Sequence, residues 1–243
     1  MSDTGFRLQI RTGSEQFEDA PLQNVTWRWL QRAIQFREFR YWKGQKHYPG
    51  LYWSSTMRAH VGYESRLELW SALGADFDPH VCFQLSQPFE LSEGAGTRRL
   101  YHVPDYLLRY DDGRLCVVDV KPASKLAKPK VQAQFAWTRR ALKSRGWEYR
   151  VESEPDDTYL QNLRFLAGYR RSIQFDQDHV HRAHERVSGS LSFGQAVASV
   201  TSICGDREEA RAIVLHLLWT RHLRADLSVP LQSTSILEAT RDA

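Results

Sequence analysis

Two carboxylates and one ammonium group stand on two apolar segments of this sequence. Asp105 lies within a run of apolar and aromatic residues, and Asp119-Val120-Lys121 ends a second such run. Continuous apolar runs are typical of strands buried on both faces, where a carboxylate needs a hydrogen-bonding partner or a cation. The residue types and their surroundings therefore predict a site for metal ions.

A tight turn joins the two segments. The first strand is expected over 102–110 and the second over 115–120, with Asp111-Asp112-Gly113 as the hairpin turn between them. This hairpin brings Asp105 and Asp119 close enough to share divalent cations. Lys121 projects from the same face as Asp119, because side chains alternate along a strand.

The chemistry that suits these groups is phosphodiester hydrolysis. Mg²⁺ takes oxygen ligands and is commonly held by one or two carboxylates together with substrate phosphate. Metal ions and an ammonium group can hold an attacking water and stabilise the charge that develops on the phosphorus centre. The alternative interpretation is that Asp105 caps a turn while Asp119 and Lys121 form a surface ion pair.

Further elements are expected around the hairpin. An amphipathic helix is indicated within 61–73, where Glu64 and Glu68 lie one turn apart, and a short strand follows over 81–87. Pro129 begins another helix, which Gly146 ends, and a further strand follows. The order of helix, three strands, helix and strand is the core order of the restriction-endonuclease-like fold, an α/β architecture with a central mixed sheet flanked by helices.

Four segments of the chain resemble the TnsA endonuclease family. They are residues 61–68 (VGYESRLE), 87–89 (QPF), 102–106 (HVPDY) and 118–122 (VDVKP), and the resemblance extends over about 41–151. TnsA-like proteins are subunits of heteromeric transposases. The resemblance implies Mg²⁺-dependent nicking of one strand of double-stranded DNA at transposon ends, together with a DDE-type transposase subunit.

The resemblance also implies which residues form the site. The acids of the family correspond to Glu64, Asp105 and Asp119, and its lysine corresponds to Lys121. These four residues are expected to be catalytic, with the three acids and the carbonyl of Val120 as ligands of Mg²⁺, for which Mn²⁺ is expected to substitute. Some family members carry Gln at the position of Asp119, whereas this chain has a carboxylate there.

Charge is distributed unevenly along the chain. Residues 156–243 hold ten arginines, no lysine and eleven acidic residues, a net of −1, whereas residues 1–155 have a net of +5. Basic groups suit phosphate contacts, which set affinity and register. The predicted nucleic-acid contacts are Lys125, Lys128 and Lys130, in a loop after the second strand, and Arg98 and Arg99 before the first. The alternative is that these basic residues belong to solvated loops.

The first fifty residues mix aromatic and basic side chains, which together can stack bases and hold phosphates. However, Trp27, Ile34 and Tyr41 also fit one face of a helix, and packing in a core is the favoured interpretation. We therefore expect residues 1–50 to form a helical extension ahead of a nuclease core over 51–154.

Residues 155–243 are predicted to form a mainly helical domain in the order of a winged-helix module, with Ser192 as a helix cap. Winged-helix modules often bind DNA, but DNA binding requires a basic surface that this region lacks. The resemblance implies contact with an AAA+ regulatory ATPase through this domain. His179, His181 and His184 lack further ligands for zinc, and the segment is interpreted as a polar connection between helices.

Composition limits the cellular setting and leaves other functions open. Cys82, Cys116 and Cys204 are far apart, which argues against a disulfide framework or a structural zinc site. Without a signal peptide or an apolar span, the sequence predicts a soluble protein of the bacterial cytoplasm. Two other functions remain: a restriction, repair or phage-defence nuclease of the same fold, and a non-catalytic DNA-binding or scaffolding protein.

Overall fold

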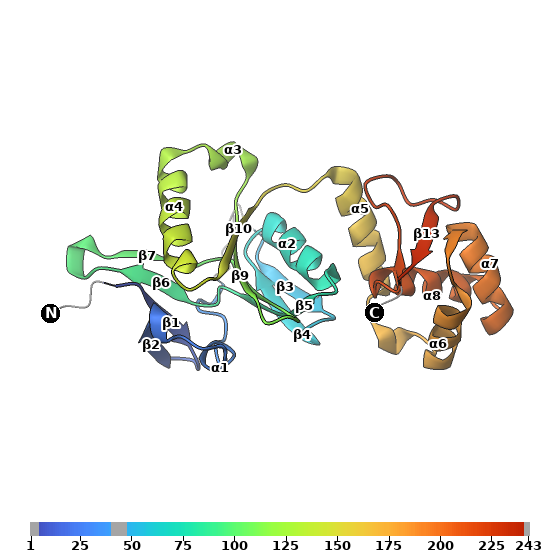
Figure 1. Cartoon of the computed structure of the whole chain (residues 1–243), viewed down its shortest axis with the longest axis horizontal. Coiled ribbons are helices and arrows are strands. Elements are labelled where there is room, and N and C mark those ends of the chain that lie inside the picture. Colours follow the sequence, from blue (N-terminus) through green and yellow to red (C-terminus); the bar gives the residue numbers. More distant parts are fainter. Residues whose placement is uncertain (1–4, 40–47, 241–243) are drawn as a thin grey trace. The chain divides into compact units, whose positions relative to one another are not determined.

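The computed structural model describes residues 5–39 and 48–240. The chain divides into two compact units, which are treated separately below. The N-terminal unit comprises residues 1–76 and 80–154, and the C-terminal unit comprises residues 77–79 and 155–243. The architecture is mixed α/β, with strands concentrated in the N-terminal unit and helices in the C-terminal unit (Figure 1).

A four-stranded sheet of order β10-β9-β8-β5 forms the centre of the N-terminal unit. Its strands are β5 (Val81–Ser86), β8 (Tyr106–Tyr110), β9 (Leu115–Val120) and β10 (Glu148–Glu152). Strands β5, β8 and β9 pair antiparallel, and β10 pairs parallel to β9. Every residue of β9 is buried, as expected for a strand covered on both faces.

The predicted hairpin is present, but its first strand is shorter than expected. Gly113 occupies the turn with φ of 88°, a conformation that glycine adopts without steric cost. Instead of one strand over 102–110, the chain forms β7 (Leu100–His102) in another sheet, and β8 begins at Tyr106. Pro104 lies in the break, where its missing N–H prevents it from donating to a continuous ladder.

A second four-stranded sheet, of order β2-β1-β6-β7, contains the N-terminal strands. Its remaining strands are β1 (Arg7–Arg11), β2 (Phe17–Pro21) and β6 (Glu90–Glu93). The expected helical extension over 1–50 is therefore wrong for the described residues, where the helices are the short η1 (Leu22–Asn24) and α1 (Trp27–Leu30). Leu8 and Ile10 are buried at the two-residue period of a strand. Tyr41 lies outside the described residues.

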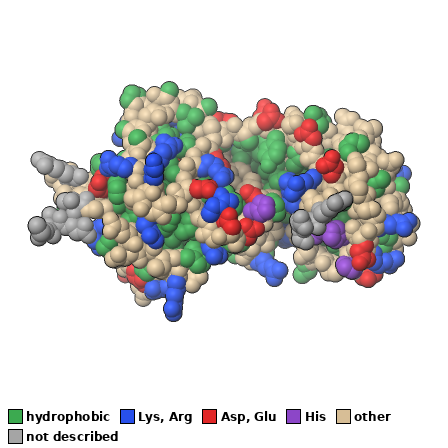
Figure 2. Space-filling view, viewed as in Figure 1, with side chains coloured by type: hydrophobic (Ala, Val, Ile, Leu, Met, Phe, Trp, Pro, Cys, Tyr) green, Lys and Arg blue, Asp and Glu red, His purple; other side chains and the backbone are tan. Residues whose placement is uncertain are grey.

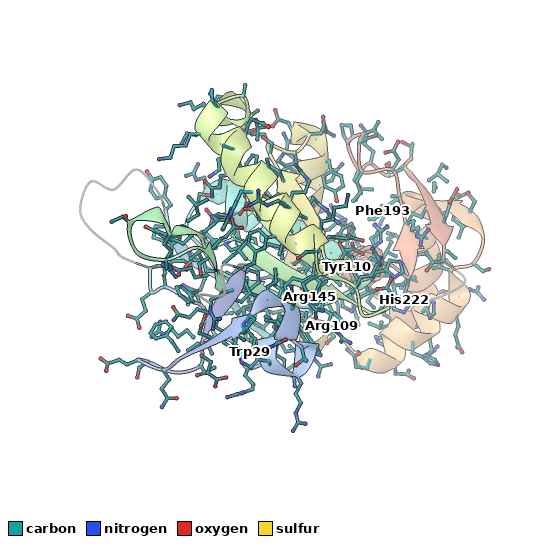
Figure 3. The ribbon with its side chains drawn as sticks, turned by 60° about the vertical axis from the view of Figure 1, so that its left-hand side comes forward. Trp29, Arg109, Tyr110, Arg145, Phe193 and His222 are labelled. Carbon is teal, nitrogen blue, oxygen red and sulfur yellow. The ribbon has the colours of Figure 1, made fainter. Side chains whose placement is uncertain are left out.

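One apolar core joins the two sheets to helix α4 (Pro129–Lys143). It includes Leu8 of β1, Phe89, Leu107 of β8 and Leu142 of α4, all of which are fully buried. Beside it, Trp29 packs against the core and Arg145 donates through Nη2 to the carbonyl of Val25 at 2.6 Å (Figure 3). The short helix α3 (Ala123–Leu126) and α4 form the connection between β9 and β10, as a parallel strand pair requires.

The remaining part of the N-terminal unit is the hairpin of β3 (Gly50–Ser54) and β4 (Ala59–Tyr63), followed by α2 (Arg66–Phe77). The helix predicted within 61–73 thus starts later than expected, because Val61 to Tyr63 belong to β4. Asp76, near the end of α2, is 6% exposed. Its carboxylate accepts hydrogen bonds from β3, through the Tyr52 hydroxyl (2.6 Å) and the Ser54 hydroxyl (2.7 Å). It also accepts from the β3–β4 turn, through the Ser55 N–H (2.9 Å) and hydroxyl (3.1 Å) and the Thr56 N–H (2.8 Å).

The C-terminal unit is a helical bundle with one small sheet. Its elements are α5 (Asp157–Leu166), η3 (Ala167–Tyr169), η4 (Ser172–Gln174), α6 (Gln177–Arg186), β11 (Ser190–Ser192), α7 (Phe193–Cys204), α8 (Arg207–Trp219), β12 (Leu223–Arg224) and β13 (Ile236–Ala239). The sheet order is β11-β13-β12. Ser192 caps α7 through a capping box with Gln195, which confirms the predicted helix cap.

Helix α8 is the centre of the C-terminal unit. Its residues Ile213–Trp219 are all buried, and the helix contacts α5, α6, α7 and η3. The second half of α8 is apolar on most sides, and a segment of this kind needs neighbours all around it.

Within the described residues, no helix is both long and apolar enough to span a membrane.

The Asp76 cluster predicts a large effect of a single substitution on stability. Asp76→Ala leaves the donors of the β3–β4 turn without a buried acceptor, so we expect the free energy of unfolding to fall by about 2–4 kcal/mol. Asp76→Asn keeps the shape of the side chain but turns an amide NH₂ toward N–H and O–H donors, so it should also lower the free energy of unfolding. Urea unfolding measures both effects, and an Asp76→Asn variant as stable as the parent chain contradicts this account.

Candidate active site

Asp105 and Asp119 lie opposite each other at the meeting ends of β8 and β9. The Asp105 N–H donates to the carbonyl of Val118 at 3.1 Å, which extends the strand pairing one residue beyond Tyr106. The Asp105 carboxylate accepts the Val120 N–H at 2.6 Å. The two acids that the sequence predicted are therefore brought together by the register of one hairpin.

The environment of Asp105 opposes its negative charge. Asp105 is partly exposed to solvent. Burial raises the pKa of Asp105 well above its usual value, and the negative charges of Asp119 and Glu68 raise this pKa further. The Val120 N–H and Lys121 act in the opposite direction and lower the pKa, but less strongly. A bound cation would relieve this unfavourable concentration of negative charge.

Asp119 is 1% exposed and is held by donors on both of its carboxylate oxygens. His102 Nε2 lies 2.8 Å from Oδ1 and 2.9 Å from Oδ2, and the Tyr149 hydroxyl donates to Oδ2 at 2.5 Å. Burial and then the charge of Asp119 raise the pKa of Tyr149, so its hydroxyl keeps the proton that it donates. Gln134 of α4 contacts the other ring nitrogen of His102 at 2.6 Å.

Val120 and Lys121 follow Asp119 directly, at the end of β9. The Lys121 N–H donates to the carbonyl of Glu152 at 2.8 Å, which continues the pairing of β9 with β10. The Val120 N–H is bonded to Asp105, whereas its carbonyl is the group that was expected to bind metal. Lys121 therefore emerges at the end of a buried strand, beside the two acids.

Glu64 and Glu68 differ in what they contact. Glu64 lies between β4 and α2, and its Oε2 is 3.7 Å from Nη2 of Arg37. The Glu68 carboxylate accepts the Glu64 N–H (2.7 Å) and the Ser65 hydroxyl (2.8 Å) at the start of α2. Its charge also raises the pKa of Asp105. Glu68, which the sequence showed one turn after Glu64, was not assigned to the site. The structure connects it to β8, because the Tyr106 hydroxyl donates to the Glu68 carbonyl at 3.2 Å.

A cleft of about 980 Å³ opens at this edge of the sheet. Cationic and anionic side chains line it together, with aromatic and aliphatic side chains between them. The cations are Arg11, Arg37, Lys121 and Lys125, the acids are Glu38, Glu64 and Glu68, and Phe17, Phe39 and Leu67 contribute apolar surface. Arg11 is used internally, since it bonds Glu38 at 2.7 Å and two backbone carbonyls.

The predicted nucleic-acid contacts are distributed over helices as well as loops. Lys125 lies in α3, Lys128 is the N-cap residue of α4 and Lys130 is in its first turn, so the expected lysine loop is largely helical. All three lysines are exposed, and Figure 2 shows basic side chains over α4 on the face in view. Arg99 instead forms an ion pair with Glu90 and stacks over Tyr101. Arg98 belongs to η2 (Gly96–Arg98), and its side chain lies outside the described ones.

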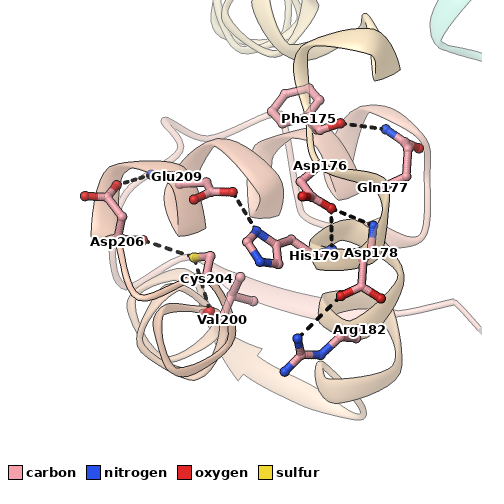
Figure 4. Close-up of polar contacts among 10 residues, drawn as sticks. All are labelled: Phe175, Asp176, Gln177, Asp178, His179, Arg182, Val200, Cys204, Asp206 and Glu209. Carbon is pink, nitrogen blue, oxygen red and sulfur yellow. Dashed lines mark hydrogen bonds and ion pairs between the residues drawn. The ribbon is translucent and has the colours of Figure 1, made fainter.

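The histidine segment of the C-terminal unit is a helix, not the connection that was expected. Asp176 caps α6 by accepting the N–H groups of Asp178 and His179. His179 Nδ1 lies 2.7 Å from Glu209 of α8, so this histidine ties two helices together (Figure 4). His184 makes a ring contact with His222. His179 and His184 therefore contribute contacts between elements of the C-terminal unit.

Asp105 and Asp119 are carboxylates of the kind that Mg²⁺ prefers as ligands. Across residues 5–39 and 48–240, no three His, Cys, Asp or Glu side chains form a ready set of metal ligands. However, Mg²⁺ is usually bound through only one or two carboxylates and keeps several waters. Asp105 and Asp119, which the strand register places opposite each other, offer such a partial set.

A family of known proteins matches the part of the chain that carries this site. Residues 78–154 match the family model described as TnsA-like endonuclease N terminal. The matched segment runs from before β5 to just after β10, so it contains Asp105, Asp119 and Lys121 but neither Glu64 nor Glu68. No curated protein matches the chain.

The different surroundings of Glu64 and Glu68 predict different effects of removing their charges. Glu68→Gln keeps one of the two acceptors at the start of α2 through its amide oxygen but removes a charge that acts on Asp105, so we expect Mn²⁺ affinity to fall about tenfold or more. Glu64→Gln, whose carboxylate faces Arg37, should have a smaller effect. Calorimetric titration with Mn²⁺ compares the two variants. A greater loss in Glu64→Gln would instead favour the residue that the sequence predicted.

Proposed function

We propose that this chain, which the match over residues 78–154 assigns to the TnsA-like nucleases, is a Mg²⁺-dependent DNA endonuclease that nicks one strand at transposon ends. The observation that carries the proposal is the meeting of Asp105, Asp119 and Lys121 at the ends of β8 and β9. These three residues lie within the matched segment, on a sheet that we assign to a restriction-endonuclease-like core.

The residues of the site have separate tasks in this proposal. Asp105 and Asp119, with Glu68 or Glu64 and the Val120 carbonyl, would hold Mg²⁺, and Mn²⁺ should substitute for it. The bound ion supplies an acidified water and neutralises the phosphoryl oxygens. Lys121 orients the attacking water and adds positive charge opposite the phosphodiester. The expected products are a 3′-hydroxyl and a 5′-phosphate.

Double-stranded DNA is the proposed substrate of the N-terminal unit. Residues 1–155 have a net charge of +5, and the exposed Lys125, Lys128 and Lys130 follow directly after the strand that ends in Lys121. Contacts of this kind to the phosphate backbone give affinity and fix the register of the duplex. Arg99 is the weakest candidate among the predicted contacts, because it is already paired with Glu90.

Protein partners are the proposed role of the C-terminal unit. The order α6, β11, α7, α8, β12, β13 would suit a winged-helix module, in which the second helix of the helix-turn-helix pair usually enters the major groove. Here that helix is α8, whose residues Ile213–Trp219 are all buried, and its exposed start carries Glu208 beside Arg207. Residues 156–243 have a net charge of −1, which suits contact with an AAA+ ATPase better than with DNA.

The nuclease proposal predicts loss of nicking on substitution of the site. Lys121→Ala and Asp119→Ala should lower nicking by about 10²–10³-fold or more, because transition-state charge loses its stabilisation. DNA affinity should stay close to that of the parent chain. The assay mixes the full chain with its gene-neighbour DDE-type transposase, Mg²⁺ and DNA bearing the element's ends, and maps the nicks.

A control and a metal test complete this experiment. Asp112→Ala removes an exposed carboxylate from the turn of the same hairpin and should leave nicking unchanged. Full activity in excess EDTA, or undiminished nicking by Lys121→Ala, would exclude the proposed chemistry. Absence of nicking under every condition with the transposase present would favour a non-catalytic role.

The lysines after β9 predict the salt dependence of DNA binding. Replacing Lys125, Lys128 and Lys130 together by Ala should reduce the slope of log affinity against log salt by about 0.9 for each phosphate group that these lysines neutralise. Arg207→Ala with Arg211→Ala, on α8, serves as the matched control and should leave the slope unchanged. Fluorescence anisotropy with a labelled duplex at several salt concentrations measures both. An equal reduction in the control would place the DNA contacts in the C-terminal unit.

A further inference from the structure

His102 links three elements at the candidate site. It is the last residue of β7, in the sheet of order β2-β1-β6-β7, whereas Asp119 belongs to β9 of the other sheet. The His102 side chain is 13% exposed, and its Nε2 reaches both carboxylate oxygens of Asp119. Gln134 of α4 contacts Nδ1 from the other side of the ring.

These contacts define the state of the ring. With the Gln134 amide NH₂ as donor, Nδ1 of His102 is an acceptor, so Nε2 carries the proton that is donated to Asp119. Gln134 on helix α4 thereby fixes the ring in one tautomer and one orientation.

The contacts also determine which oxygen of Asp119 stays available. A carboxylate offers about four lone-pair positions, two on each oxygen. Oδ2 accepts from His102 and from the Tyr149 hydroxyl, so both of its positions are used. Oδ1 accepts from His102 and retains one position. Of the positions on the Asp119 carboxylate, these donors therefore leave one, on Oδ1, for a further partner.

We propose that His102 is a positioning residue that holds Asp119 in the orientation in which Oδ1 can bind the divalent cation. This inference rests on the proposed function and deepens it, because Asp105, Asp119 and Lys121 alone do not fix the direction of the Asp119 carboxylate. Side chains that orient a metal ligand typically contribute about 10–100-fold to metal affinity or activity.

A purely structural role for His102 makes a different prediction. If His102 only joined β7 to β9, its removal would lower the melting temperature and leave the metal affinity of the folded protein unchanged. A positioning role instead requires that metal affinity depend on whether an N–H donor is present at the place of Nε2. This dependence should hold regardless of the thermal stability of the variant.

The experiment measures Mn²⁺ binding by calorimetry on the folded full chain, with thermal unfolding recorded for each variant. His102→Ala should weaken Mn²⁺ binding by about 10–100-fold, and His102→Gln, whose amide NH₂ replaces the Nε2 donor, should recover most of this loss. Gln134→Leu, which frees the ring without removing it, should give a smaller loss. His80→Ala removes the exposed His80–Asp111 pair of the same unit and should leave Mn²⁺ affinity unchanged.

In the nicking assay, His102→Ala should raise the Mg²⁺ concentration for half-maximal rate more than it lowers the rate at saturating Mg²⁺. Unchanged Mn²⁺ affinity in folded His102→Ala, or no recovery in His102→Gln, would overturn the inference. The Asp105→Asn variant distinguishes failure of the inference about His102 from failure of the proposed function. If the parent chain binds Mn²⁺ and Asp105→Asn does not, only the role of His102 is in question; if the parent chain binds no Mn²⁺, both proposals fail together.

Discussion

The burial of two carboxylates side by side is the constraint on which the N-terminal unit depends. Asp105 and Asp119 lie opposite each other where the pairing of β8 with β9 ends, and every residue of β9 is buried. Burial and then the charge of Asp119 raise the pKa of Asp105, so a second negative charge at this place is costly. The Val120 N–H, His102 and Tyr149 compensate part of this cost, and Lys121 supplies the nearby positive charge. A divalent cation is the natural further compensation.

The surrounding elements act on this pair through long-range contacts. The N-terminal strands extend the sheet to which β7 belongs, and β7 carries His102 to Asp119. Helix α4 contributes both core packing and Gln134. On the other side, Asp76 holds the β3–β4 turn to α2, the helix that brings Glu68 toward Asp105. Elements that lie outside the hairpin in sequence therefore help to define the electrostatics of the site.

The C-terminal unit follows a different physical logic. The second half of its central helix is covered on every side, and its histidines and acids serve as caps and links between helices, as His179 and Glu209 do. In the function proposed above, the surface of this unit would contact other proteins, while the N-terminal unit would cut DNA.

The sequence by itself determined the local features: the apolar run of β9, the Gly113 turn, the start of α4 at Pro129 and the opposition of Asp105 and Asp119. These depend on residues close together in the chain, for which period, turn chemistry and hairpin register are sufficient. The sequence did not predict the N-terminal strands. The two-residue alternation of Leu8 and Ile10 identifies a strand only when β1 is seen paired with β6, which lies about eighty residues later. Only the tertiary structure decided that Glu68 acts on Asp105 and that His102 holds Asp119. Both interactions join elements from different parts of the chain, and such contacts exist only once the sheets and helices have packed.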